Sequence, residues 1–272
     1  MANDCIGQGI SFLYQFDLGN KHIINPGQNI ISVTSTATGD FDKANLVTDS
    51  TRHRWRSAEI LTTQEIVIKA ELKSQIDTFA IIGHNLTEEA VIRLEANIDN
   101  NFLAPPFSQL IPWRKNYIVW LTELDDEYEY YKISILDPTN PCGYIEIGRI
   151  IGGRAFTLSG GEDVSDSFSI SKQDASDKMR TEGFSTASNQ RVKYRQLRAP
   201  LSKLDSKDGS NDNWQGLRDM FDYVGITVPI LTILDRDQPD LFTAWGKFDD
   251  IPTESYLTNQ YVNESLKFSE EF

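Results

Sequence analysis

The spacing of apolar residues between positions 65 and 151 restricts this chain to β-structure more firmly than any other feature. Apolar and polar side chains alternate over residues 65–73 and again over residues 92–98. A period of two residues puts one set on each face of a strand, so both segments are expected to form half-buried strands. Residues 76–82 are apolar on both faces apart from Asp77 and Thr78, which predicts a central strand. Further strands are expected at residues 29–33, 117–120, 128–136 and 144–151.

Turn signals separate these segments, and no stretch of residues 28–156 has a convincing helical period. Pro105, Pro106 and Pro112 predict an irregular connection over residues 101–113, because proline cannot donate a hydrogen bond to a strand ladder. Many short strands at regular spacing are typical of a β-sandwich. We therefore expect residues 28–156 to form a β-sandwich domain.

The pattern changes after the Gly-rich segment at residues 159–163, which is the best linker candidate. Residues 157–272 are expected to form a small β-rich α+β domain with a single helix at about residues 213–224. The N-terminal arm, residues 1–27, is expected to supply one strand, which must pair with the second domain or with a neighbouring subunit. The predicted apolar face of the helix consists of Leu217, Met220, Phe221 and Val224.

Charge and composition exclude several classes of protein. The net charge of −14 argues against non-specific nucleic-acid binding, because phosphate contacts require excess cationic charge. No apolar run approaches the roughly 18 residues of a transmembrane helix, and the N-terminus lacks the features of a secretory signal. We expect synthesis in the cytoplasm and no membrane insertion. Cys5 and Cys142 are expected to be two independent thiols rather than a disulfide.

Residues that could carry catalysis are scarce. His22, His53 and His84 do not lie at metal-ligand spacing with one another or with a cysteine, and no nucleophile elbow or phosphate-binding loop is present. The acidic residues 125–127 are expected to form a solvated turn rather than a glycosidase pair. His84 precedes Asn85 after a buried strand and is interpreted as a turn residue rather than a general base. The sequence therefore predicts a protein that is not an enzyme and has no cofactor.

The segment from Asp49 to Arg56 carries the strongest candidates for a binding site. Arg52, Arg54 and Arg56 alternate with His53 and Trp55, so a strand would place the three guanidinium groups on one face and Trp55 in the core. The arginines could bind an acidic partner, form salt bridges within the protein or between subunits, or contribute to a sugar site. Asp49 lies in an Asn/Thr/Ser-rich loop and is a candidate ligand for a structural calcium ion.

Three segments, residues 45–57, 76–86 and 144–153, resemble a known type of β-sandwich. The first contains Thr-Arg-His-Arg-Trp-Arg-Ser, the second ends in Gly-His-Asn-Leu, and the third reads Tyr-Ile-Glu-Ile-Gly-Arg-Ile-Ile-Gly-Gly. They are similar to discoidin-like (galactose-binding-like) jelly rolls, including versions in tail proteins of tailed bacteriophages. In that family, loops at one end bind sugars or pack against neighbours, and a loop aspartate helps to hold a cation. The resemblance implies the cation-holding role for Asp49, and Trp113 is expected, with the three arginines, to be a candidate contact to a ligand or partner.

The second half loosely resembles the ring-forming domain of distal tail proteins. Together the two resemblances imply a non-catalytic structural protein of a phage tail tip or baseplate, made in the host cytoplasm and located in the virion. Its partners would be copies of itself in a trimeric or hexameric ring, the tube, hub and tape-measure proteins, and a host-surface glycan. The first alternative is a carbohydrate-binding adhesion module, and the second is a glycosidase accessory-domain protein.

Overall fold

The computed structural model describes residues 10–13, 30–121, 124, 126–158, 168–180, 186–189, 193–205, 212–253, 255–256 and 261–271. The chain divides into two compact units. Unit 2 is built mainly from residues 10–157 and 230–243, and unit 1 from residues 158–229 and 244–271. The domain boundaries expected between residues 27 and 28 and between residues 156 and 157 remain predictions.

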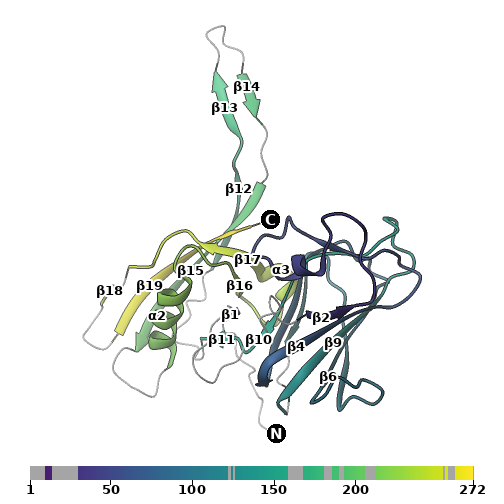
Figure 1. Ribbon diagram of the computed structural model, residues 1–272. Coiled ribbons are helices and arrows are strands. Elements are labelled where there is room, and N and C mark those ends of the chain that lie inside the picture. Colours follow the sequence, from purple (N-terminus) through teal and green to yellow (C-terminus); the bar gives the residue numbers. More distant parts are fainter. Residues whose placement is uncertain are drawn as a thin grey trace. The chain divides into compact units, whose positions relative to one another are not determined.

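Unit 2 contains a jelly-roll sandwich of two antiparallel sheets. One sheet has the order β3-β10-β5-β8 and the other β2-β4-β9-β6-β7. Figure 1 shows β4, β9 and β6 side by side in the second sheet. The strands are β2 (Ile30–Val33), β3 (Trp55–Arg56), β4 (Gln64–Ser74), β5 (Thr78–His84), β6 (Val91–Asn97), β7 (Phe107–Ile111), β8 (Tyr117–Leu121), β9 (Tyr128–Leu136) and β10 (Glu146–Gly153).

The core of the sandwich lies between these sheets and follows the alternation in the sequence. Along β9, Tyr131, Ile133 and Ile135 are buried, whereas the residues between them are only partly buried. The expected central strand is β5, which lies between β10 and β8 and is buried from Thr78 to Ile82. Trp55 is fully buried in this core, as the sequence predicted. Inward-facing residues of two sheets are thus packed together as in other sandwiches.

Two expectations for this unit are wrong. Residues 101–113 are not irregular throughout, because Phe107–Ile111 forms β7 and pairs with β6. Pro106 and Pro112 flank β7 rather than interrupt it, and β7 is an edge strand, where proline at the ends removes no ladder bond. The Arg-Trp-Arg strand is also shorter than expected, since Thr51–His53 lies in a turn and β3 begins at Trp55.

A small ladder completes unit 2. The N-terminal strand β1 (Ser11–Leu13) pairs with β11 (Phe156–Thr157) and β16 (Ile230–Ile233), so its partners come from the same chain. Arg236 Nη1 donates to Ser11 Oγ and Thr157 Oγ1, both at 3.1 Å. The turn expected at residues 235–240 leads into α3 (Pro239–Phe242), whose first residue is a proline with a backbone angle suited to that position.

Unit 1 is an antiparallel sheet covered by one helix. The sheet order is β17-β19-β15-β12, and β18 also pairs with β19. The elements are β12 (Ser169–Asp174), β13 (Asp177–Arg180), β14 (Thr186–Asn189), β15 (Lys193–Asp205), α2 (Asp212–Val224), β17 (Thr243–Phe248), β18 (Ser255–Tyr256) and β19 (Tyr261–Glu270).

The helix α2 agrees with the sequence prediction. Leu217, Met220, Phe221 and Val224 are all buried. Phe221 packs edge-on against Phe248 of β17 at 4.8 Å between ring centroids, and Phe248 packs in the same way against Phe268 of β19. One apolar stripe of the helix therefore covers the apolar face of the sheet.

The strands β13 and β14 pair only with each other among the described residues. The fold class expected from the sequence is confirmed, with a β-sandwich and a small β-rich part that contains one long helix. None of the helices in the described part of the chain is both long and apolar enough to cross a membrane.

Candidate functional site

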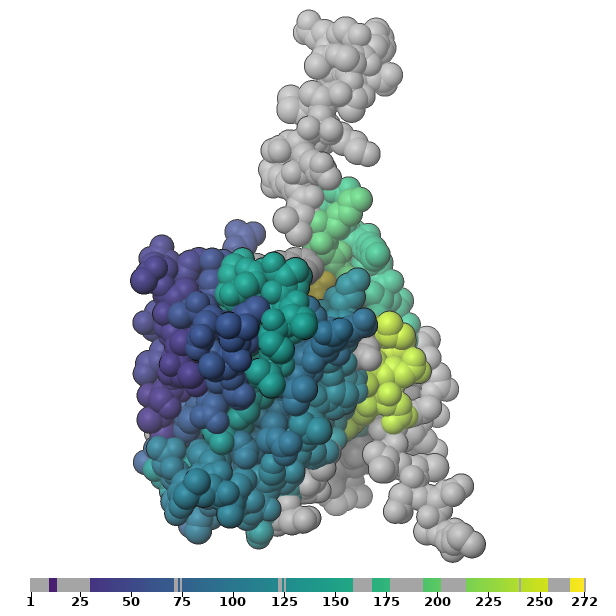
Figure 2. Space-filling view, turned by 90° about the vertical axis from the view of Figure 1, so that its right-hand side faces the viewer, coloured from purple at the N-terminus to yellow at the C-terminus, as the bar shows by residue number. Residues whose placement is uncertain are grey.

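The strand registers bring several loops to one end of the jelly roll, which we call the loop end. In the first sheet Ile147 pairs with both Trp55 and His84, and Ile82 pairs with Tyr117. In the second sheet β4 begins, β9 ends and β6 begins at this same end. The loop end therefore consists of the connections at residues 34–54, 57–63, 85–90, 112–116 and 137–145. In Figure 2, dark-blue atoms from the β3–β4 region adjoin teal atoms from the segment before β10.

Arg54, Arg56 and Glu146 meet at the loop end. Arg54 Nη1 lies 2.6 Å from Glu146 Oε1. Arg56 donates to Glu146 Oε2 from Nε at 3.1 Å and from Nη2 at 2.6 Å. The cross-strand pairing of Arg56 with Glu146 fixes this geometry, because directly opposite residues share one face of the sheet. Both arginines thus have an acidic partner within the chain.

Two aromatic rings hold Arg56 in place. Its guanidinium carbon lies 3.8 Å from the centroid of the Phe41 ring and 3.9 Å from that of Tyr144. A planar guanidinium stacks favourably on aromatic faces. The stack joins the loop that contains Phe41 to the loop that contains Tyr144, and it restricts Arg56 to one orientation.

The charge of Glu146 is stabilised by this arrangement. Burial alone would raise the pKa of the Glu146 carboxyl, but hydrogen bonds from Arg56 and Arg54 outweigh that effect and bring the pKa below its usual value. Glu146 therefore stays ionised at neutral pH. A carboxyl group in this state cannot act as the general acid that a glycosidase requires.

Side-chain amides position the loops around the three charged residues. Asn45 Nδ2 donates to the backbone oxygens of Asp40 and Arg54. On the other side, Asn85 Nδ2 donates to Tyr144 O at 2.9 Å, and its Oδ1 accepts from Glu146 N at 2.8 Å. These bonds satisfy backbone groups that no strand ladder reaches, so the loop end is built with defined geometry.

His84 behaves as the turn residue that the sequence indicated. Its Nδ1 accepts a hydrogen bond from Leu86 N at 3.2 Å. Its Nε2 is buried without a hydrogen bond of ordinary geometry. Burial lowers the pKa of His84 to about 4, against small raising effects from the Arg114 backbone and Asp137. The imidazole is therefore neutral at pH 7 and lacks an exposed nitrogen for proton transfer.

The remaining predicted residues are not part of this cluster. Asp49 Oδ1 accepts from the buried Arg149 Nη1 at 2.9 Å, so its carboxylate has a positive partner from the chain itself. Among the residues that the structure describes, no group of three His, Cys, Asp or Glu side chains could hold a metal ion. A calcium ion at Asp49 thus stays a prediction without a ligand set.

The structure separates Arg52 from the other two arginines. Arg52 and His53 are exposed in the turn before β3, so His53 does not share the core face with Trp55 as expected. The strand alternation fails here because Thr51–His53 leaves the extended conformation.

The aromatic residues of the 101–113 segment form no open platform. Trp113 packs against the core, and its Nε1 donates to Leu86 O at 3.0 Å. Phe107 packs edge-on against Trp120, and Lys132 Nζ lies 4.9 Å from the centroid of Phe102. These contacts give Trp113 a structural role at the loop end, where its side chain is only partly buried.

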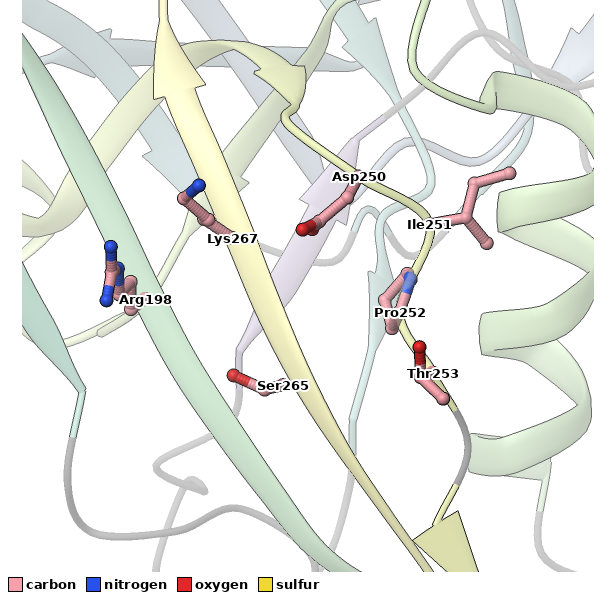
Figure 3. A pocket seen from close by; sticks show the side chains of 7 residues that line it. All are labelled: Arg198, Asp250, Ile251, Pro252, Thr253, Ser265 and Lys267. Carbon is pink, nitrogen blue, oxygen red and sulfur yellow. The ribbon is translucent and has the colours of Figure 1, made fainter.

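Unit 1 contains a separate polar groove with a volume of about 400 Å³ (Figure 3). Arg198 of β15 and Lys267 of β19 lie directly opposite each other along one side of it. Lys267 Nζ is 3.5 Å from Asp249 Oδ2, and Arg198 Nη2 is 3.3 Å from Gln196 Oε1. The groove is open, and Lys267 and Arg198 already have polar partners from the chain, so it is a weaker candidate than the loop end. Its lining consists of Arg198, Asp250, Ile251, Pro252, Thr253, Ser265 and Lys267.

Comparisons with known proteins find similarity at the level of the fold alone. No family model matches the sequence, and a search of curated proteins finds no match. Among solved structures, the chain is similar to CBM32-3 from a family 31 glycoside hydrolase of Clostridium perfringens, with 15% identity, 48% of this chain and 94% of that chain covered, and a TM-score of 0.38.

Two further solved structures have the same level of similarity. The family 32 CBM from C. perfringens NanJ, in complex with galactose, is 16% identical over 49% of this chain and 98% of that chain, with a TM-score of 0.37. Reduced XRCC1 bound to the DNA polymerase β catalytic domain is 14% identical over 45% and 93%, with a TM-score of 0.36. At these identities and scores, the comparisons assign no function.

Phe41, Tyr144 and Glu146 were not among the residues singled out from the sequence. Glu146 is 90 residues from Arg56 along the chain, and no local spacing links the two. The pairing of β3 with β10 was the missing information. The only usable signal was a carboxylate at the first position of a buried strand in which Arg149 is the one other charged residue, because a buried carboxylate requires a partner.

Proposed function

We propose that this chain is a non-catalytic carbohydrate-binding protein that attaches to a glycan surface through the loop end of its jelly roll. The observation that carries this proposal is the convergence of Arg54, Arg56 and Glu146, braced by Phe41 and Tyr144. The side chains of Arg54 and Arg56 are 42% and 26% exposed, so a ligand can reach them.

The physical case rests on preorganisation. Binding costs free energy whenever flexible side chains must be ordered, and long arginine side chains are among the most flexible. At the loop end the ordering has already occurred on folding, through the salt bridges and the ring stack. Fixed guanidinium donors next to partly exposed rings are suited to hydroxyl-rich ligands, which need several hydrogen bonds at defined positions.

The same geometry argues against an enzyme. The Glu146 carboxylate is stabilised in its charged form, and His84 is neutral and buried. Neither group is suited to the proton transfers of glycoside hydrolysis. Binding without turnover is therefore the function that the site supports best, and a glycosidase accessory role requires a second protein or domain to supply the chemistry.

A glycan array probed with the full-length chain, followed by calorimetry on the best hit, tests the proposal. We expect binding that weakens at least about tenfold in Arg54→Ala, since hydrogen bonds to charged groups contribute about 1.5–3 kcal/mol. Arg198→Ala, an exposed arginine in unit 1, is the matched control and should bind like the wild type. An array without a reproducible hit, or equal affinities for Arg54→Ala and the wild type, would contradict the proposal.

A second candidate function is a structural component of a phage tail tip or baseplate. The observation that favours it is the ladder of β13 and β14, which pairs with no third strand in the described part of unit 1. An isolated two-stranded ladder is marginally stable in water, so this element is suited to a contact with a neighbouring subunit. A heterologous contact of this kind generates a ring where the rotation between neighbouring subunits closes.

This second candidate predicts a trimer or hexamer that associates with tube, hub and tape-measure proteins in a virion. Light scattering and negative-stain imaging of the purified protein would test it. A monomer at high protein concentration, with no ring even in the presence of tail-tube proteins, would count against it. The two candidates are compatible, because a ring can display glycan-binding domains.

A further inference from the structure

We infer that the loop end selects glycans that carry a carboxylate, such as uronic or sialic acids, over neutral sugars. The inference rests on the proposed carbohydrate-binding function and specifies its ligand class. It is based on the ratio of two guanidinium groups to the single Glu146 carboxylate and on the unused hydrogen-bond donors of Arg54 and Arg56.

The first step is the charge balance of the cluster. Two guanidinium groups share one carboxylate, which leaves one positive charge in excess. Arginine cannot lose its proton in a protein, and Glu146 is ionised, so the excess persists across the whole physiological pH range. A fixed positive charge that no residue of the cluster neutralises favours a ligand with one negative charge.

The second step is the inventory of donors and acceptors. Arg54 uses Nε for Thr51 O and Nη1 for Glu146. Arg56 uses Nε and Nη2 for the same carboxylate. Arg54 Nη2 and Arg56 Nη1 have no acceptor among the residues that the structure describes.

The acceptors of the cluster are already engaged. Glu146 Oε1 accepts one bond and Oε2 accepts two. The cluster therefore presents donors to a ligand and few acceptors. A carboxylate accepts hydrogen bonds and donates none, whereas a sugar hydroxyl must also place its own hydrogen. Charge-assisted bonds from guanidinium to carboxylate are about twice as strong as neutral ones.

The third step is the effect of neighbouring charges. Asp40 and Asp42 flank Phe41, and Asp42 Oδ1 accepts from Ala44 N as the cap of a short 3₁₀ helix, Lys43–Val47. Lys43 and the exposed Arg52 lie in the same loop and supply as many positive charges as these aspartates supply negative ones. The other connections of the loop end contain four acidic residues and two basic ones, so the positive excess is confined to the cluster of Arg54, Arg56 and Glu146 itself. The negative net charge of the whole chain repels an anionic ligand at long range, but physiological salt screens this repulsion beyond about 8 Å.

Matched sugar pairs test the inference directly. The probes are the methyl glycosides of galactose and galacturonate, those of glucose and glucuronate, and lactose with sialyllactose, each titrated by calorimetry or ligand-observed NMR at 0.15 M salt. We expect the acidic member of at least one pair to bind at least tenfold more tightly than its neutral partner. The methyl ester of the same uronate should bind like the neutral sugar, because esterification removes the negative charge and keeps the sugar ring and its hydroxyl groups.

Two variants connect the preference to the cluster. Arg54→Gln should reduce the ratio of acidic to neutral affinity at least fivefold, whereas Arg198→Gln in unit 1 should leave that ratio unchanged. If Arg54→Gln does not fold by circular dichroism, Arg54→Met replaces it, since methionine also removes the charge and keeps a long unbranched side chain. An unchanged ratio in the folded variant would overturn the inference.

The outcomes separate this inference from the proposed function. Equal binding of acidic and neutral members would overturn the carboxylate preference and leave carbohydrate binding intact. No binding of any sugar would overturn both. Competition by acetate as strong as that by the uronates would show a simple anion site and would also overturn the inference.

Discussion

Protonation of His84 should lower the stability of the jelly roll as the pH falls from 6.5 toward 4. Burial lowers the pKa of His84 from 6.5 to about 4 in the folded protein. Below pH 6.5 the unfolded chain therefore binds a proton that the folded chain excludes. The stabilisation from His84 is complete above pH 6.5 and is lost as the pH falls toward 4. At about 1.4 kcal/mol per pH unit, the whole loss amounts to about 3 kcal/mol.

The perturbation that isolates this effect is His84→Asn. An asparagine side chain can accept the hydrogen bond from Leu86 N that the imidazole now accepts, because this is the local geometry of an Asx turn. The variant should lose stability at pH 7.5, where the imidazole fills its site, but it should lose little more between pH 6.5 and 4.5. The wild type should lose about 2–3 kcal/mol over the same range.

Urea unfolding followed by tryptophan fluorescence at half-unit pH intervals measures both curves. His53→Asn is the control, because His53 is exposed in a turn and its replacement should leave the wild-type slope unchanged. NMR titration of the imidazole in the folded protein gives an independent value. Equal slopes for the wild type and His84→Asn between pH 6.5 and 4.5 would refute the reasoning, as would a titration midpoint near 6.5.

Three further substitutions test the packing and the registers. A Cβ atom at Gly246 would collide with the Ser269 carbonyl of the neighbouring strand. Gly246→Ala should therefore destabilise unit 1 by at least ~3 kcal/mol, the upper end of the usual range for overpacking. A melting temperature equal to that of the wild type would contradict the register of β17 on β19. Trp55 is fully buried, so Trp55→Ala should cost about 3–5 kcal/mol in urea unfolding, and a cost below about 1 kcal/mol would place this residue outside the core. Arg198→Glu should stabilise unit 1 by about 0.2–1 kcal/mol, because it replaces a repulsive cross-strand pair with Lys267 by an attractive one; a clear loss of stability in thermal unfolding would argue against that pairing.

The sequence predicts elements well where one local pattern determines them. Strands β4, β6 and β9 follow the alternation of apolar and polar residues, and α2 follows its apolar stripe between a polar N-terminal segment and Gly225. In these segments one face of the strand or helix is buried, and the spacing of apolar residues along the sequence shows which face that is.

Prediction fails where tertiary pairing overrides a local signal. The prolines near β7 indicate an irregular segment, yet the free edge of β6 is enough to order the residues between them. The alternation of Arg52, Arg54 and Arg56 indicates one strand face, but the chain turns at Thr51–His53 and leaves only the last residues extended. Such choices depend on which partner strand is near, and a single sequence does not contain that information.

Only part of the candidate site could be predicted from the sequence. Arg54 and Arg56 stand out because two guanidinium groups flank a tryptophan on one short segment. Their partner Glu146 and the rings of Phe41 and Tyr144 come from segments whose proximity follows from the strand order alone. The charge balance on which the proposed carboxylate preference depends is therefore a property of the fold rather than of any motif.

The stack of Phe41, Arg56 and Tyr144 has a consequence for when the protein becomes able to bind. Its three members come from early and late segments of the jelly roll, and Tyr144 directly precedes β10. During synthesis, a nascent chain that ends before Tyr144 has neither the second ring nor the Glu146 carboxylate, and Arg54 and Arg56 repel each other. The proposed site is therefore complete only when the last strand of the sandwich has paired with β3.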